Sequence, residues 1–147
     1  MSINNLDKET LKQIATDKSQ GGRYYAFERL LVGFGHWSRH NVWPRGLAVF
    51  DSNVKSRRAI CFNEPVEVFL TIDRLLARYK IDAAYTVQFL AFDLFFLTSA
   101  GAKKARASKV SKLKRLLNSD SGYFPYDYAK AYTAMVELIR LDLLKEL

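Results

Sequence analysis

The chain has 147 residues with seven glycines, three prolines and one cysteine, and its formal net charge is +8. This length suffices for one domain with a buried core, and apolar and aromatic fractions of 49% and 14% argue against disorder. The single cysteine, Cys61, excludes an internal disulfide and a cysteine-rich zinc site, and it fits a reducing cytosol. Because the sequence has neither a hydrophobic N-terminal run nor 18 consecutive apolar residues, we expect no signal peptide and no membrane span.

The spacing of apolar residues by three and four predicts an all-α fold, a single compact domain of five or six helices. Residues 1–22 are expected to form a short helix, capped by Asn5 or Asp7, and a joint that contains two glycines. Residues 23–147 are expected to form the helical domain itself, with a helix-turn-helix-like C-terminal part.

The second predicted helix covers residues 23–40 and carries one apolar stripe. Gly33 and Gly35 inside it each cost about 1 kcal/mol relative to Ala, which suggests a close neighbour, a kink or a break. His36 and His40 have the spacing at which two imidazoles share a metal. No Asp or Glu lies between or just after them, so we interpret them as two partly exposed histidines at a helix end and expect no metal.

Residues 41–62 have no long periodic pattern and contain several turn signals. A secondary basic cluster lies in this predicted loop and consists of Lys55, Arg57 and Arg58. Two interpretations stay open, a solvated loop and a contact with phosphate or with a protein partner.

The sequence Asn63-Glu64-Pro65 predicts the start of the next helix, and Asp82 is expected to cap the one after it. Residues 83–97 are apolar nearly all round, which is typical of a helix at the centre of a small helical domain. We therefore expect one central helix there, with Phe92 and Phe95 in the core.

The basic excess of the chain is local. Residues 94–119 contain no Asp or Glu, and without the seven bases in this stretch the chain has 16 basic and 15 acidic residues. We expect a helix over residues 102–118 whose bases form a phosphate-binding surface; a solvated helix face, a membrane contact and a carboxylate-rich protein partner are the alternatives. The bases are Lys103, Lys104, Arg106, Lys109, Lys112, Lys114 and Arg115, and the predicted apolar seam is Val110, Leu113, Leu116 and Leu117.

A final helix is expected from Pro125 and Asp127 to about Lys145. Tyrosines follow the basic helix directly, and such residues either contact phosphates and bases or form half-buried edges of a core. Tyr126 and Lys130 join the basic helix as candidate nucleic-acid-binding residues.

Catalysis has little support in the sequence, which lacks the common phosphate-loop, serine-hydrolase and zinc-protease motifs. We expect no enzyme and no cofactor. Asp73, Asp82 and Asp93 recur at intervals that helix caps and helix faces explain, although they also leave a metal-dependent nuclease as an alternative.

Several motifs together resemble the late-gene antiterminators of lambdoid phages, the Q-type class without a zinc finger. The likeness covers residues 24–141 in layout. It rests on Glu28-Arg29-Leu30-Leu31, His36-Trp37-Ser38-Arg39-His40-Asn41, Ser56-Arg57-Arg58, Ile72-Asp73, Leu75-Leu76-Ala77-Arg78, the aromatic helix after them, and a basic end with a last helix of the Ala129–Leu141 type.

This resemblance implies a DNA-binding transcription regulator in a bacterial host's cytoplasm that loads onto promoter DNA and host RNA polymerase and suppresses pausing and termination. The predicted joint over residues 118–125 is longer than the usual turn of a helix-turn-helix. Two alignments therefore compete, one in which residues 103–118 read DNA and one in which residues 126–140 do. A protein-only adaptor or inhibitor that binds an acidic partner is the other alternative function.

Overall fold

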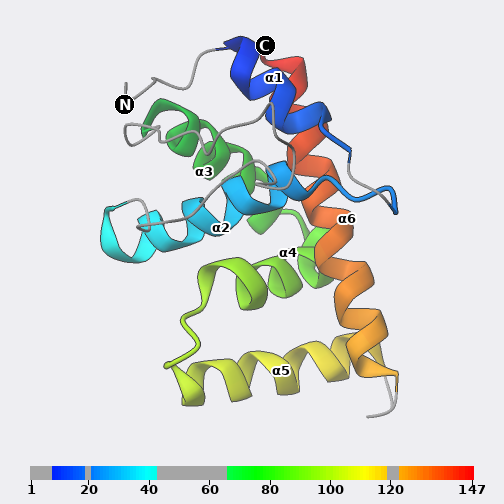
Figure 1. Ribbon diagram of the computed structural model, residues 1–147. Helices are drawn as coiled ribbons and strands as arrows, with labels where there is room; N and C mark the ends of the chain where they lie inside the picture. The colour runs from blue at the N-terminus through cyan, green and yellow to red at the C-terminus, as the bar shows by residue number, and fades with distance from the viewer. Residues whose placement is uncertain (1–7, 19–20, 43–65, 119–122) are drawn as a thin grey trace. The chain divides into compact units, whose positions relative to one another are not determined.

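The computed structural model describes residues 8–18, 21–42, 66–118 and 123–147 (Figure 1). In these residues the chain is helical and has no strand, which confirms the predicted all-α class. No helix among them is both long and apolar enough to cross a bilayer. The elements are α1 (Lys8–Thr16), α2 (Tyr25–His40), α3 (Val66–Lys80), a 3-10 turn η1 (Ala83–Tyr85), α4 (Thr86–Phe92), a π-helical turn η2 (Asp93–Leu97), α5 (Lys103–Leu117) and α6 (Phe124–Lys145).

The chain divides into two compact units, one formed by residues up to Ile72 with Arg140–Leu147 and the other by Asp73–Ile139. Long helices α3 and α6 contribute residues to both. Several predictions lie outside the described residues: the caps Asn5 and Asp7, Cys61, the helix start Asn63-Glu64-Pro65, and the secondary basic cluster Lys55, Arg57 and Arg58.

In the first unit, α1 packs against α2, and the aromatic stripe of α2 meets α3. The ring of Phe69 lies 5.6 Å from Phe34 and 5.2 Å from Trp37, measured between ring centroids. Helix α2 is continuous through Gly33 and Gly35, which are both buried. Of the three interpretations of these glycines, a close neighbour, a kink and a break, the break is therefore excluded.

Arg140 belongs to the core of this unit although it is charged, and only 7% of its surface is exposed. Its Nη1 donates to the carbonyl of Ala15 at 2.9 Å, and its guanidinium lies 3.8 Å from the ring centroid of Tyr24. A buried cation is tolerated when it is hydrogen-bonded in this way. The side chain therefore ties the last turns of α6 to α1 and faces the interior.

In the second unit, α4 and α5 lie side by side and the first half of α6 joins them (Figure 1). The shared core is small and consists of Ala91, Leu94, Leu113 and Ala131. Half-buried side chains surround it, namely Val87, Leu90, Val110, Leu117, Phe124, Tyr128 and Tyr132.

The prediction of one regular helix over residues 83–97 is wrong in its details. Asp82 caps as expected, because its Oδ1 accepts a hydrogen bond from the Ala84 N–H at 3.0 Å, but the capped element is the 3-10 turn η1. The last five residues form the π-helical turn η2, and Thr98 closes it by donating its hydroxyl to the Asp93 carbonyl at 2.9 Å. Burial of this stretch is concentrated in its second half, from Ala91 onward.

Phe92 and Phe95 differ, which corrects the expectation that both lie in the core. Phe92 has no exposed surface, whereas Phe95 is 45% exposed. The Phe95 ring stacks on Tyr132, with centroids 4.2 Å apart and an angle of 17° between the planes. An all-round apolar pattern therefore does not ensure burial on every side of a helix.

The two phenylalanines provide a test of this packing. Phe92→Ala should lower the free energy of unfolding by about 3–5 kcal/mol, because it removes a fully buried ring. Phe95→Ala should cost only about 1–2 kcal/mol, the loss of one aromatic stack and partial burial. Urea unfolding followed by circular dichroism measures both, and equal losses would contradict the observed difference in burial.

Candidate nucleic-acid interface

Helix α5 forms the centre of the candidate interface. It begins at Lys103 and ends at Leu117, where Asn118 adopts a left-handed conformation (φ 50°, ψ 42°) and its N–H donates to the Lys114 and Arg115 carbonyls. Such a C-cap satisfies carbonyls that the helix leaves without partners. At the other end no side chain caps the helix and its first turn has no acidic residue.

The inward face of α5 is narrower than predicted. Leu113 is fully buried, and Val110 and Leu117 pack beside it against the small core. Leu116 is 45% exposed, so its assignment to the apolar seam is wrong. The reason is the helical step of about 100° per residue, which places Leu116 on the flank of a seam centred between Leu113 and Leu117.

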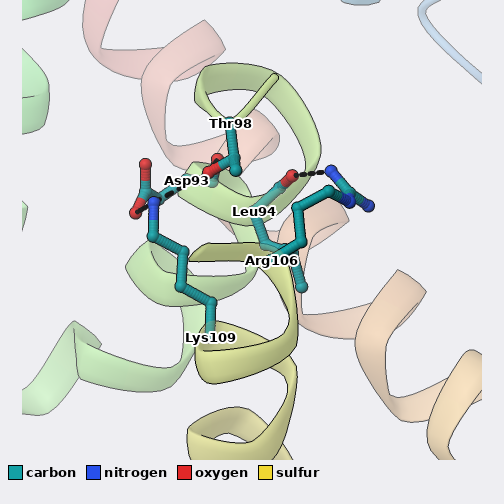
Figure 2. Close-up of polar contacts among 5 residues, drawn as sticks. All are labelled: Asp93, Leu94, Thr98, Arg106 and Lys109. Carbon is teal, nitrogen blue, oxygen red and sulfur yellow. Dashed lines mark hydrogen bonds and ion pairs between the residues drawn. The ribbon is translucent and has the colours of Figure 1, made fainter. Parts of the chain in front are cut away.

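Two of the seven bases hold the end of the preceding helical segment, as Figure 2 shows. Lys109 Nζ lies 2.8 Å from Asp93 Oδ2 and donates to the Thr98 hydroxyl oxygen, also at 2.8 Å. Arg106 Nη1 donates to the Leu94 carbonyl at 3.1 Å. The last carbonyls of a helix lack intrahelical donors and carry partial negative charge, so cations are favoured there. These two bases therefore serve the fold.

A third base, Lys114, is also engaged within the unit. Its Nζ lies 5.1 Å from the ring centroid of Phe124, and its side chain is half-buried.

Tyr128 lies in the same unit, and burial raises the pKa of its hydroxyl to about 12, although the Arg106 charge opposes the shift. The Tyr128 side chain forms part of the edge of the core.

The other four bases of α5, Lys103, Lys104, Lys112 and Arg115, are exposed. Of these, Lys104, Lys112 and Arg115 lie within about 80° of one another around the helix axis, since the gaps between them are eight and three residues. Ser108 and Ser111 are exposed on the same side. We call this surface the outer basic face; it consists of Lys104, Ser108, Ser111, Lys112 and Arg115.

The outer basic face has dimensions that suit a nucleic acid. From Lys104 to Arg115 it extends about 16 Å along the helix axis, compared with a width of about 12 Å for the major groove of DNA. Lysine and arginine bind phosphate oxygens through charge, and serine hydroxyls donate to the same oxygens. A helix with this face could therefore contact phosphates on both sides of one groove.

The start of α6 presents the other candidate residues. Tyr126 is 70% exposed, and Lys130, one turn later on the same side, is also exposed. Tyr123 is 69% exposed, whereas Tyr128 and Tyr132 are half-buried against the core. Tyr128 and Tyr132 therefore form half-buried edges of the core, whereas for Tyr123 and Tyr126 a contact with phosphates or bases stays a prediction.

The three aspartates of the nuclease alternative differ in role. Asp82 caps η1 and Asp93 pairs with Lys109, while Asp73 lies exposed on α3. In the described part of the chain, no group of three or more His, Cys, Asp and Glu residues gathers in a way that could hold a metal ion.

Helical spacing places Lys104, Lys112 and Arg115 on one side of the basic helix, but sequence reasoning missed the internal contacts of Arg106, Lys109 and Lys114. The sequence signal that could have indicated these contacts was Asp93, the last acidic residue before the acid-free stretch, followed by Thr98 and the helix break at Gly101.

Comparisons with protein-family models, curated proteins and solved structures give no match for this chain. The resemblance to phage antiterminators therefore stays a prediction.

Lys109 and Lys112 give a matched test of this division, because both are lysines of one helix. Lys109→Met should lower the free energy of unfolding by about 1–2 kcal/mol, since it leaves the Asp93 carboxylate and the Thr98 hydroxyl without their cation. Lys112→Met should change it by less than about 0.5 kcal/mol, as is usual for exposed sites. Equal effects in chemical denaturation would show that the Lys109 contacts contribute nothing to stability.

Proposed function

We propose that this chain is a DNA-binding protein that contacts duplex DNA through the outer basic face of α5. The observation that carries the proposal is the exposure of four bases on one helix, in a stretch without acidic residues. The internal contacts of this helix account for Arg106, Lys109 and Lys114. They leave a concentrated positive surface that the fold does not need.

The position of two of these bases supports the proposal. Lys103 and Lys104 occupy the first turn of α5, where the helix dipole is positive and cations are unfavourable. Helix stability does not explain bases at that end, whereas binding a polyanion does, because each neutralised phosphate releases condensed counterions.

The distribution of charge also favours α5 over α6 as the main DNA contact. In the segment 126–140 the basic residues are Lys130, which is exposed, and Arg140, which faces the interior. Tyr126 and Lys130 then form a lesser contact at the start of α6. We therefore propose the first of the two helix-turn-helix alignments, with residues 103–118 on the DNA.

The role in transcription is proposed from the resemblance alone. Under this proposal, the protein is a phage-type regulator that loads onto promoter DNA and host RNA polymerase and suppresses pausing and termination. The basic helix would supply the DNA contact of such a regulator, and a different surface would supply the polymerase contact.

The DNA proposal predicts a specific dependence on salt. Three or four phosphate contacts from α5 give a slope of log K against log[salt] of about −3 to −4. Replacing Lys104, Lys112 and Arg115 together by Gln should weaken binding and flatten this slope by roughly 2–3 units. Fluorescence anisotropy with labelled duplex DNA at several salt concentrations measures both quantities.

A matched control separates a local contact from a general effect of charge. Lys8, Lys12 and Lys145 are exposed lysines outside α5, and replacing all three by Gln removes the same charge. This variant should keep a slope within about one unit of the wild type, because these lysines lie outside the proposed contact and neutralise none of its phosphates. Equal flattening in the two triple variants would refute a contact localised to α5.

The same assay with and without Mg²⁺ distinguishes the alternative functions. Salt-sensitive binding without cleavage supports the proposal, and cleavage that requires Mg²⁺ supports the nuclease. No binding to duplex DNA, with capture of an acidic protein that depends on the outer basic face, supports the adaptor or inhibitor.

The transcription proposal has its own test. The full chain, immobilised and incubated with bacterial lysate treated with nuclease, should retain RNA polymerase subunits. The Lys104, Lys112 and Arg115 triple variant should retain them equally well, because the proposal assigns polymerase to another surface. DNA binding without polymerase retention would leave a DNA-binding protein and remove the antiterminator assignment.

A further inference from the structure

Two imidazoles lie together at the C-terminal end of α2. His36 and His40 are one helical turn apart, and their ring centroids are 4.6 Å apart with an angle of 49° between the ring planes. They are the only histidines in the chain. Neither belongs to the outer basic face, so a role for this pair is independent of the proposed function.

A hydrogen bond determines which nitrogen of His36 is available. His36 Nδ1 lies 2.8 Å from the carbonyl oxygen of Val42. Because a carbonyl oxygen only accepts, Nδ1 carries the hydrogen, and the neutral ring presents an unprotonated Nε2. Histidines that bind metals commonly have this arrangement, in which one nitrogen donates to a carbonyl or carboxylate and the other binds the ion.

The spacing of the rings suits a shared ion. A tetrahedral ion with metal–nitrogen bonds of about 2.0–2.1 Å separates two nitrogen ligands by about 3.3 Å. The two ring centroids are 4.6 Å apart, and a shared ion requires the His40 ring to turn one nitrogen toward Nε2 of His36, which keeps its Nδ1 hydrogen bond to Val42. The end of the helix carries partial negative charge, which favours a cation, although the neighbouring Arg39 opposes it.

Contrary to the expectation from the sequence, we propose that His36 and His40 form a binding site for a divalent transition metal ion such as Zn²⁺ or Ni²⁺, with water completing the coordination. Imidazole nitrogen selects this class of ion over Mg²⁺ and Ca²⁺, which prefer oxygen. Two protein ligands leave coordination positions open, so the site is distinct from a closed structural zinc site.

The test uses the untagged full chain and ZnCl₂ or NiCl₂ as the probe. Isothermal titration calorimetry should show one ion bound per chain. Proton NMR during a Zn²⁺ titration should show both imidazole signal sets shifting together, with no overlap from other histidines. His36→Gln and His40→Gln should each weaken binding at least about tenfold, the lower end of the effect of losing even an outer-shell partner.

Two further variants test whether a thiol, or any pair of histidines on this helix, would bind the ion equally well. Cys61→Ser removes the one thiol that could compete for zinc and should leave the affinity unchanged. Ser38→His combined with His40→Ser keeps two histidines but places them about 200° apart around the helix, where they cannot share an ion. Circular dichroism without metal verifies that each variant is folded.

The outcomes decide between a built site and incidental binding. Tight binding in the wild type with a loss of at least about tenfold in the displaced-histidine variant supports the shared site. Equal affinity in these two proteins, a response of only one imidazole, or the absence of saturable binding of one ion would overturn it.

Discussion

The arrangement of the second unit depends on how the η2 turn ends. This turn leaves backbone carbonyls without helical donors, and side chains satisfy two of them: Thr98 donates to the Asp93 carbonyl and Arg106 to that of Leu94. Lys109 then bridges the Asp93 carboxylate and the Thr98 hydroxyl. Because unpaired carbonyls in a partly buried site are costly, these contacts hold α5 in one orientation. They thereby determine which of its bases face inward and which face solvent.

This division has energetic and functional consequences. Partly buried, hydrogen-bonded charges such as Lys109 contribute to stability, whereas exposed charges contribute little to folding and can be used for binding. The buried face of α5 is small, with Leu113 as its only fully buried residue among those described. Most of the surface of α5 therefore faces solvent, and the outer basic face extends over several turns of it. Under the proposed function, phosphate binding at this surface requires no rearrangement of the core.

Local chemistry made several features predictable from sequence. The Asp82 cap, the extent of α5 and the start of α6 next to Pro125 depend on capping and on interactions between residues close in the chain. The packing of Phe95 and Leu116 was not predictable in this way. Each residue has the periodicity and hydrophobicity of a core position, and each is half exposed because the neighbouring helices cover only one side of its own helix. The His36 tautomer was equally inaccessible, since it depends on the carbonyl of Val42 beyond the helix end.

By itself, the sequence determined the helical class, the position of the basic stretch and its separation from every acidic residue over 26 positions. Composition and short-range periodicity are sufficient for those features, because they depend on local propensities and on counting charges. Helical spacing puts Lys104, Lys112 and Arg115 on one side of α5, but the tertiary structure alone decided that this side is exposed and that Arg106, Lys109 and Lys114 make contacts within the fold. It likewise placed Arg140 inside and Tyr126 outside. The physical reason is that the environment of a side chain is set by partners distant in sequence: Ala15 lies 125 positions from the guanidinium that it binds.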